Sequence, residues 1–425
     1  MNSVQIRNGT ATVSVEATHE TKVGHWIFSE KAVCWLMRRK SGDLLECVNL
    51  PVSRYMELEV CFVCRNFGCS DSLLDRCSFF VFERIEMIMM VQTKRKIRQT
   101  KTYKWTMLVI LALLCVAATV VCVSVGSVKY TLSQVLEAFF NEEAEARLII
   151  WNVRLPRILC GGLVGICLSL AGCILQGVMR NHLASPSTIG VTSGASFVGY
   201  LILIVFPQYF RLLPVAAILG SFGTTMVIYG LAYDRGVSPV KMILSGLAVS
   251  AVFGAFNDMI KIFFSEKLAD AASFMVGSLN GVSWDDFTLV LPYAAVGIGI
   301  CFFLPAKMNI LMLGDEMANT LGLRTERFRL LLIMVSSLLA GASIAVAGMI
   351  SFVGLIVPHI ARLIIGSDHK YLFPASILMG YSFVVICDTV GRIVLKVGTV
   401  PVSVVLSFIG APFFLYLLRK KDKKG

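Results

Sequence analysis

The 425 residues are 56% hydrophobic and only 16% charged, whereas soluble domains are about 45–50% apolar and about 25% charged. This composition excludes an ordinary soluble protein and favours one that lies in lipid. The net charge of +12 would also suit nucleic-acid binding, but the basic residues gather at the ends of apolar segments. We therefore expect the lipid bilayer, and no nucleic acid, as the partner of this charge.

The first 90 residues differ from the rest of the chain. They mix charged, polar and short apolar stretches without a sustained period. We predict an N-terminal extension over 1–90 that is either disordered or precedes the true start of translation, near Met87, Met89 or Met90. Four of its cysteines are spaced as zinc ligands often are: Cys61, Cys64, Cys69 and Cys77. A second CxxC pair and a histidine at ligand spacing are both missing, so we expect no metal site.

From Trp105 onward, apolar runs alternate with short polar breaks. Most runs have about the 20 residues that cross a bilayer, and in lipid they must be helical to satisfy their own backbone. The predicted spans are about 105–126, 157–176, 189–206, 213–233, 240–263, 287–306, 328–350, 352–366, 372–391 and 401–418. The eighth is short, so we expect it to be tilted, broken or partly re-entrant. The predicted fold is an all-α integral membrane protein with about ten transmembrane helices over 91–425.

Ten is an even number, so both ends of the chain are predicted on one side of the membrane. Lys and Arg gather before the first span, from Lys94 to Lys104, and after the last, from Arg419 to Lys424. Beyond residue 90 this topology places 20 Lys and Arg residues on the cytoplasmic side and 9 on the outer side. The positive-inside rule therefore predicts that both termini are cytoplasmic.

The second and seventh predicted spans share a short pattern. Residues 165–172 read GICLSLAG and residues 341–348 read GASIAVAG. These spans cross in opposite directions, so the match predicts inverted-repeat halves, an architecture typical of transporters. The alternative is that small residues recur wherever membrane helices pack closely.

Polar residues inside the spans are costly in lipid and therefore suggest function. Asn257 and Asp258 lie in the fifth span, and we expect them to face a central translocation path. Asp258 and Lys261 are three residues apart, and Asp388 and Arg392 are four apart, so each pair can form on one helix face. The alternative for both pairs is a structural role near the membrane surface.

The loop between the sixth and seventh spans has the pattern of a short amphipathic helix that ends in glycine. On the predicted topology it is cytoplasmic, and such a helix suits the docking of a motor protein. Its alternative is a solvated connector. The residues expected to couple to an ATPase are Leu313, Gly314, Asp315, Glu316, Ala318, Leu321 and Gly322.

No catalytic motif stands out anywhere in the sequence. HExxH, a nucleophile elbow and the phosphate loop GxxxxGK[ST] are all missing. We therefore expect a transport subunit rather than an enzyme, with no cofactor. If transport is driven by ATP, a separate polypeptide must hydrolyse it.

Short stretches along the chain match one transporter family in the same order. They are Arg154-Leu155-Pro156-Arg157, Leu170-Ala171-Gly172, Asn181-His182-Leu183-Ala184-Ser185-Pro186, Gly190–Ala195, Gly277-Ser278-Leu279, Leu313–Glu316, Gly348–His359, Gly366–His369 and Gly410–Phe414. On these residues the chain from about 94 to 420 resembles the FecCD-type permeases. Those are the membrane subunits of ATP-driven importers for iron–siderophore complexes, haem and cobalamin.

The resemblance implies a permease of the bacterial cytoplasmic (inner) membrane that pairs with a second copy or a related subunit around a central path. It also implies two cytoplasmic ATPase subunits and an extracytoplasmic substrate-binding protein. Arginines at the positions of Arg154, Arg157 and Arg392 contact glutamates of that binding protein in the family, so we expect these three to dock it. A secondary transporter with inverted repeats is the alternative, and a membrane-embedded enzyme is disfavoured.

Overall fold

The computed structural model describes residues 3–7, 10–16, 22–28, 32–39, 44–51 and 100–422, except 127, 129, 142, 234–238, 396 and 397 in the last range. Contacts divide the chain into two units, Met1–Lys96 and Ile97–Gly425. The four spaced cysteines and the candidate start methionines lie outside the described residues. The assignment of 1–90 to a separate extension stays a prediction.

The first unit contains a five-stranded antiparallel sheet in which each strand pairs with the next along the chain. Its strands are β1 (Ser3–Arg7), β2 (Thr10–Glu16), β3 (Lys22–Phe28), β4 (Ala32–Arg39) and β5 (Leu44–Pro51). An irregularity between Met37 and Arg38 shifts the register of β4 against β5.

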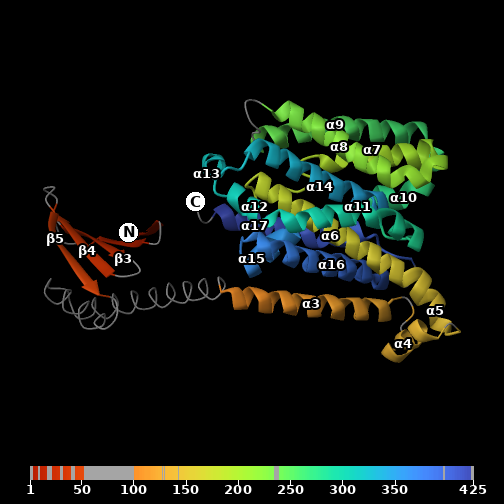
Figure 1. The fold of residues 1–425 in the computed structure, drawn as a ribbon, viewed down its shortest axis with the longest axis horizontal. Helices are drawn as coiled ribbons and strands as arrows, with labels where there is room; N and C mark the ends of the chain where they lie inside the picture. The colour runs from red at the N-terminus through yellow and green to blue at the C-terminus, as the bar shows by residue number, and fades with distance from the viewer. Residues whose placement is uncertain are drawn as a thin grey trace. The chain divides into compact units, whose positions relative to one another are not determined.

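The second unit is a helical bundle (Figure 1). Its elements are α3 (Lys101–Ser124), α4 (Leu132–Phe140), α5 (Glu145–Ile149), the π-helix η1 (Ile150–Arg154), α6 (Leu155–Val178), α7 (Val191–Tyr200), the π-helix η2 (Leu201–Val205), η3 (Pro207–Leu212), α8 (Leu213–Ala232), α9 (Pro239–Phe263), η4 (Ser265–Lys267), α10 (Leu268–Val276), α11 (Trp284–Phe303), α12 (Pro305–Leu311), α13 (Asp315–Thr320), α14 (Thr325–Ala347), α15 (Val353–Ile365), α16 (His369–Val394) and α17 (Val402–Asp422).

Each of the ten predicted spans coincides with a helix of this bundle. Among the described residues, seven helical segments are long and apolar enough to cross a membrane, and three shorter apolar helices, Val191–Val205, Val353–Ile365 and Val402–Leu415, match the remaining spans. The eighth span, expected to be short, is the 13-residue helix α15. The predicted all-α membrane fold is confirmed.

The centre of the bundle is α6. It is apolar on nearly every side and, as expected for such a helix, almost entirely buried. It packs against α11, α14, α15 and α16. Glycines allow this close approach: a Cβ on Gly165 would lie 2.1 Å from the carbonyl oxygen of Gly380, and one on Gly172 would lie 1.8 Å from that of Gly354. Packing through small residues is typical of helices in lipid, where no hydrophobic force drives association.

The packing pattern supports two related halves. The helix α6 packs against α16 and α15. In the same way, α14 packs against α8 and α7. The repeated sequence pattern follows the same rule, since Gly165 meets Gly380 on α16 while Gly341 meets Ile218 on α8. The short sequence match therefore marks equivalent helix crossings, as inverted repeats require.

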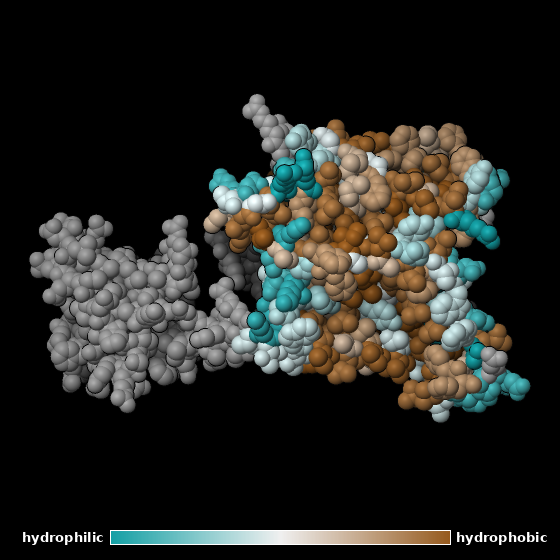
Figure 2. All heavy atoms as spheres, viewed as in Figure 1, coloured by the Kyte–Doolittle hydropathy of each residue, from teal (hydrophilic) through white to brown (hydrophobic). Residues whose placement is uncertain are grey.

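Among the seven long apolar helical segments described, α9 and α3 are the least covered, and α11 follows at 22%. Only 17% of the apolar window of α3 and 11% of that of α9 is buried, against 89% for the helix that contains α6. Figure 1 shows α3 and α9 on opposite sides of the bundle, and Figure 2 shows a largely hydrophobic outer surface. Lipid or a second subunit must therefore cover both helices.

Candidate functional site

An ion-pair cluster joins α6 to α16. The Arg157 guanidinium makes a two-pronged pair with Asp388, with Nε 2.9 Å from Oδ2 and Nη2 2.8 Å from Oδ1, and Nη1 donates to the side-chain oxygen of Asn280 at 3.1 Å. Arg392 Nε lies 3.4 Å from Asp388 Oδ2. The predicted pairing of Asp388 with Arg392 is confirmed, and Asp388 holds Arg157 as well.

Arg154 binds backbone instead of a carboxylate. Its Nη1 donates to the carbonyls of Val123 at 2.6 Å and Ser124 at 3.1 Å, and its Nη2 donates to that of Val128. The guanidinium also lies 4.8 Å from the Tyr130 ring centroid. Arg154 therefore satisfies the carbonyls that α3 leaves open at its C-terminal end.

The three arginines expected to dock the binding protein lie together at this end of the bundle. Arg392 Nη2 donates to the Cys122 carbonyl at 3.1 Å, beside the carbonyls that Arg154 holds. Only 4% of Arg154, 6% of Arg157 and 7% of Arg392 is exposed. To contact a docked protein, these side chains must therefore give up some of their present partners inside the subunit.

The two residues expected on the translocation path point in different directions. Asp258 is 70% exposed at its side chain and pairs with Lys261 at 2.9 Å, which confirms the predicted pair. Asn257 is buried, and its Oδ1 has no hydrogen-bond partner among the described residues. Only Asp258 lies on the uncovered face of α9, so the two positions are not equivalent candidates for a path.

The helix α13 is anchored to the bundle by ion pairs and has exposed apolar side chains on it and at both of its ends. Asp315 pairs with Arg180, two residues beyond α6, and with Arg329 of α14 at 2.7 Å. Ala318 is fully buried, whereas Met317 of α13 and the residues that flank this helix, Leu313 and Leu321, are each about 60% exposed and form an apolar stripe. Such an apolar stripe on a well-anchored segment is suited to lie in a groove of another protein.

Glycines bound this helix for a conformational reason. Gly314 has φ +116° and Gly322 has φ +82°, values that side chains other than glycine rarely adopt. The expected glycine terminus is therefore confirmed, and Glu316, which is exposed, lies beside the apolar stripe between these two turns.

The charge state of Asp315 reflects these contacts. Burial alone would raise its pKa, but the guanidinium groups of Arg329 and Arg180 more than offset this and hold the pKa below its ordinary value. Asp315 is therefore ionised at neutral pH and acts as the anchor of α13.

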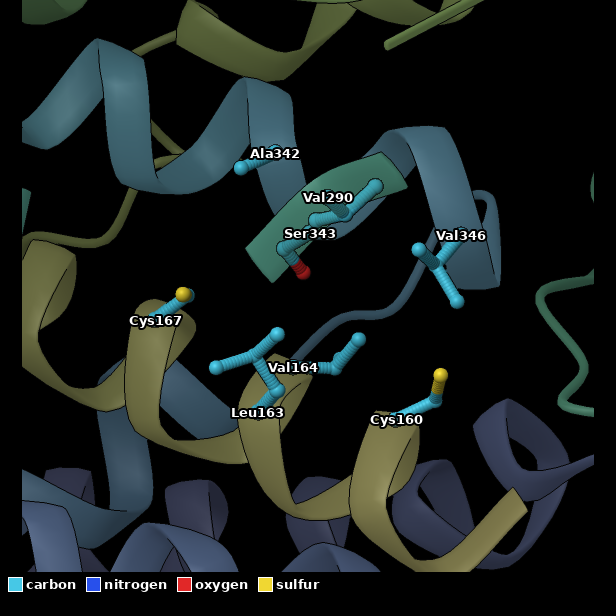
Figure 3. Close-up of a pocket in the computed structure, with 8 residues that line it drawn as sticks. All are labelled: Cys160, Leu163, Val164, Cys167, Val290, Ala342, Ser343 and Val346. Atoms are coloured by element: carbon cyan, nitrogen blue, oxygen red, sulfur yellow. The ribbon is translucent and has the colours of Figure 1, made fainter. Parts of the chain in front are cut away.

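A narrow gap lies between α6, α11 and α14 (Figure 3). Its walls are Cys160, Leu163, Val164, Cys167, Val290, Ala342, Ser343 and Val346. The gap leaves no space that a water molecule can enter. It is a packing gap in the core and not a substrate site.

One polar network was not foreseen from the sequence. Asn309 of α12 donates to Asp368 at 2.8 Å and accepts from the His369 backbone N–H at 3.0 Å, while Lys104 lies 3.6 Å from Asp368. This network ties the segment before α13 to the start of α16. The one residue of this network that the sequence could have indicated is Asp368, because aspartate is favoured at helix N-caps. Here Asp368 caps α16 and accepts a hydrogen bond from the Lys370 N–H.

The model of the FecCD transport family matches residues 110–420, the whole bundle from within α3 to within α17. The chain belongs to this family. Among curated FecCD relatives, the cobalamin import permease BtuC of Halobacterium salinarum is 38% identical over 288 residues, which cover 67% of this chain and 77% of the relative.

Two further relatives come from Bacillus subtilis. The Fe(3+)-citrate import permease YfmE is 34% identical and the match covers 75% of this chain and 96% of the relative. The iron(3+)-hydroxamate import permease FhuG is also 34% identical, with 76% and 100% covered. These FecCD relatives are all permease subunits of import systems.

A solved structure has the same fold. It is a metal-chelate type ABC transporter in an inward-facing conformation, 31% identical, with a TM-score of 0.68 over 74% of this chain and 99% of the other. The chain is therefore a multi-pass membrane permease of the FecCD family.

Proposed function

We propose that the chain is the permease subunit of an ATP-binding-cassette importer that carries an iron–siderophore complex, haem or cobalamin into the cytoplasm. The observation that carries this proposal is the match to importer permeases over residues 110–420. An extracytoplasmic binding protein delivers the substrate. This binding protein is proposed to do most of the selecting among substrates.

The ATPase subunits are proposed to bind at α13. The stripe of Leu313, Met317 and Leu321 offers a hydrophobic ridge, and the pairing of Asp315 with Arg180 and Arg329 fixes this ridge to α6 and α14. ATP hydrolysis in a separate subunit agrees with the missing phosphate loop. Each of two permeases then takes one ATPase.

The substrate path is proposed to lie between this subunit and a second one, either identical or related. Support comes from the uncovered face of α9, which carries the exposed Asp258. The charge bias of 20 against 9 supports cytoplasmic termini and a place in the cytoplasmic membrane. On this topology α13 is cytoplasmic, and Arg154, Arg157 and Arg392 lie at the outer end, where the binding protein docks.

Co-purification tests the proposed role of α13. The chain is co-expressed with the ATPase and the binding protein encoded beside it, and the ATPase retained by a tag on the permease is quantified. Met317→Asp puts a charge in the apolar stripe, and Glu316→Lys reverses a charge beside it, so each should lose the ATPase while the permease stays in the membrane. Lys307→Asp, an exposed charge reversal on the neighbouring α12, is the control and should retain the ATPase.

Two outcomes of the co-purification would contradict these assignments. Unchanged retention in both α13 variants would show that the ATPase does not bind there. Failure of the native chain to retain any ATPase would contradict the importer assignment itself.

A further inference from the structure

The short helix α4 has three distinct faces. At 100° per residue, Leu132, Leu136, Phe139 and Phe140 fall within an arc of about 100°, and each is at least 40% exposed, with Phe140 at 88%. Val135 and Ala138 border this arc and are buried. The remaining arc carries Ser133, Gln134 and Glu137, all exposed. One edge of the helix is thus packed, one face is polar, and one face is apolar and uncovered.

The position of α4 is fixed by its own cap and by its neighbours. Thr131 and Gln134 form a reciprocal capping box at its start. The helix contacts α3, α5 and η1. Because its buried edge and its ends are fixed, the apolar face cannot turn inward, and another molecule must cover it.

Aromatic rings continue from this face along the same end of the bundle. The Phe139 ring lies 5.9 Å from that of Trp151, which lies 5.7 Å from that of Trp284. The Trp284 indole N–H donates to the Trp151 carbonyl at 2.9 Å. Tryptophan is enriched where a membrane meets water, because its ring is apolar and its N–H is polar. The row joins α4, η1 and the start of α11.

We propose that α4 and this aromatic row form an interfacial anchor that lies among the lipid headgroups of one leaflet, the outer one on the proposed topology. The helix α4 contacts α3, whose exposed side chains are largely apolar. In Figure 2 hydrophobic surface reaches the end of the bundle where Figure 1 places α4 and α5, with hydrophilic side chains beyond it. A helix with one apolar and one polar face lies in the plane of the membrane surface.

A lipid surface fits this face better than the binding protein does. Figure 1 places α4 beside the end of α3, on the side of the bundle away from α9. The second subunit and the central path are proposed at α9. The binding protein is proposed to dock through charge at Arg154, Arg157 and Arg392, and Arg154 lies near the start of α4. The exposed face of α4 is apolar instead and lies beside α3, which is largely uncovered. The location of α4 on the α3 side does not depend on which substrate is carried.

Single-tryptophan fluorescence tests the anchor in proteoliposomes. The five native tryptophans are replaced by phenylalanine, which keeps the aromatic rings, and thermal unfolding confirms that the bundle is intact. Phe140→Trp then reports on the apolar face, Glu137→Trp on the polar face of the same helix, and Val116→Trp on the exposed surface of α3. Quenching is measured with phosphatidylcholine brominated at shallow or deep acyl positions, and with acrylamide in the water.

The anchor predicts a different pattern for each position. Tryptophan at 140 should emit to the blue of that at 137, be quenched most by the shallow bromines, and have a several-fold lower acrylamide constant. Tryptophan at 116 should respond most to the deep bromines. Equal acrylamide quenching at 140 and 137, with no response to brominated lipid, would overturn the proposal. Protection of position 140 that appears only when binding protein is added would assign the face to that protein and would likewise overturn it.

Discussion

Arg157 and Asp388, 231 positions apart in the chain, form a buried two-pronged ion pair that fastens the central helix α6 to α16. Arg392, one turn further along α16, contacts the same carboxylate. Two guanidinium groups thus depend on one aspartate in surroundings with little water. Breaking such a pair costs far more than forming it gains, because the remaining charges stay buried.

Asp388→Asn should therefore destabilise the protein strongly, by about 3–5 kcal/mol, since it leaves two buried arginines without a counter-ion. Asp258→Asn is the matched control. It breaks an exposed aspartate–lysine pair within one helix, for which about 0–1 kcal/mol is expected. Thermal unfolding in detergent compares the two variants. Equal stability of both would show that the Asp388 cluster contributes no more than a surface pair.

The proposed docking arginines are tested by charge reversal. Arg154→Glu combined with Arg157→Glu should abolish the increase in ATP hydrolysis caused by the binding protein, and Arg392→Glu should reduce it. Arg211→Glu, at an exposed arginine of η3 on the proposed outer side, is the control and should keep the increase. Salt screens ion pairs at the edge of a protein interface. The increase in ATP hydrolysis that the binding protein causes in the native transporter should therefore fall as ionic strength rises.

Size-exclusion profiles must accompany this test, because all three arginines hold contacts inside the subunit. A folded double variant that responds fully to the binding protein, at low and at physiological salt, would show that these side chains only secure the ends of α3 and α6.

The anchor of α13 should depend on pH in a defined direction. Since the folded-state pKa of Asp315 is lowered, its pairs contribute stability above the unfolded-state pKa and lose it as pH falls through the folded-state value. The loss of thermal stability caused by Asp315→Asn should therefore be constant near neutral pH and shrink below the ordinary pKa of 3.8. A difference between native protein and variant that does not change across this acid range would contradict the assigned ion pairs.

Adjacent positions on α9 should differ in access to water. In a chain without native cysteines, Asp258→Cys should react with a water-soluble thiol reagent, because that side chain lies on the uncovered face. Asn257→Cys should be protected, because that side chain is buried in the bundle. Labelling is followed by mass shift, with and without nucleotide. Equal protection at both positions in every nucleotide state would exclude a water-filled path along this face.

The sequence was informative wherever the relevant signal is local. Apolar runs predicted the ten helices that match membrane spans, but they did not predict short helices such as α4 and α12. Spacings of three and four predicted the pairs of Asp258 with Lys261 and Asp388 with Arg392. The partners of Arg157 and Asp315 were missed because they lie on other helices, and no spacing rule links residues so far apart. Arg154 was missed for a different reason, since the backbone carbonyls that it binds carry no side-chain signature.

ATP-dependent uptake by proteoliposomes tests the importer assignment most directly. The purified permease and ATPase are reconstituted together, and the binding protein is added outside with radiolabelled ferric hydroxamate, ferric citrate, haem or cobalamin. The account predicts accumulation of one of these substrates only when ATP is enclosed and the binding protein is present. Uptake driven by a proton or sodium gradient, without ATP or binding protein, would contradict it and identify a secondary transporter.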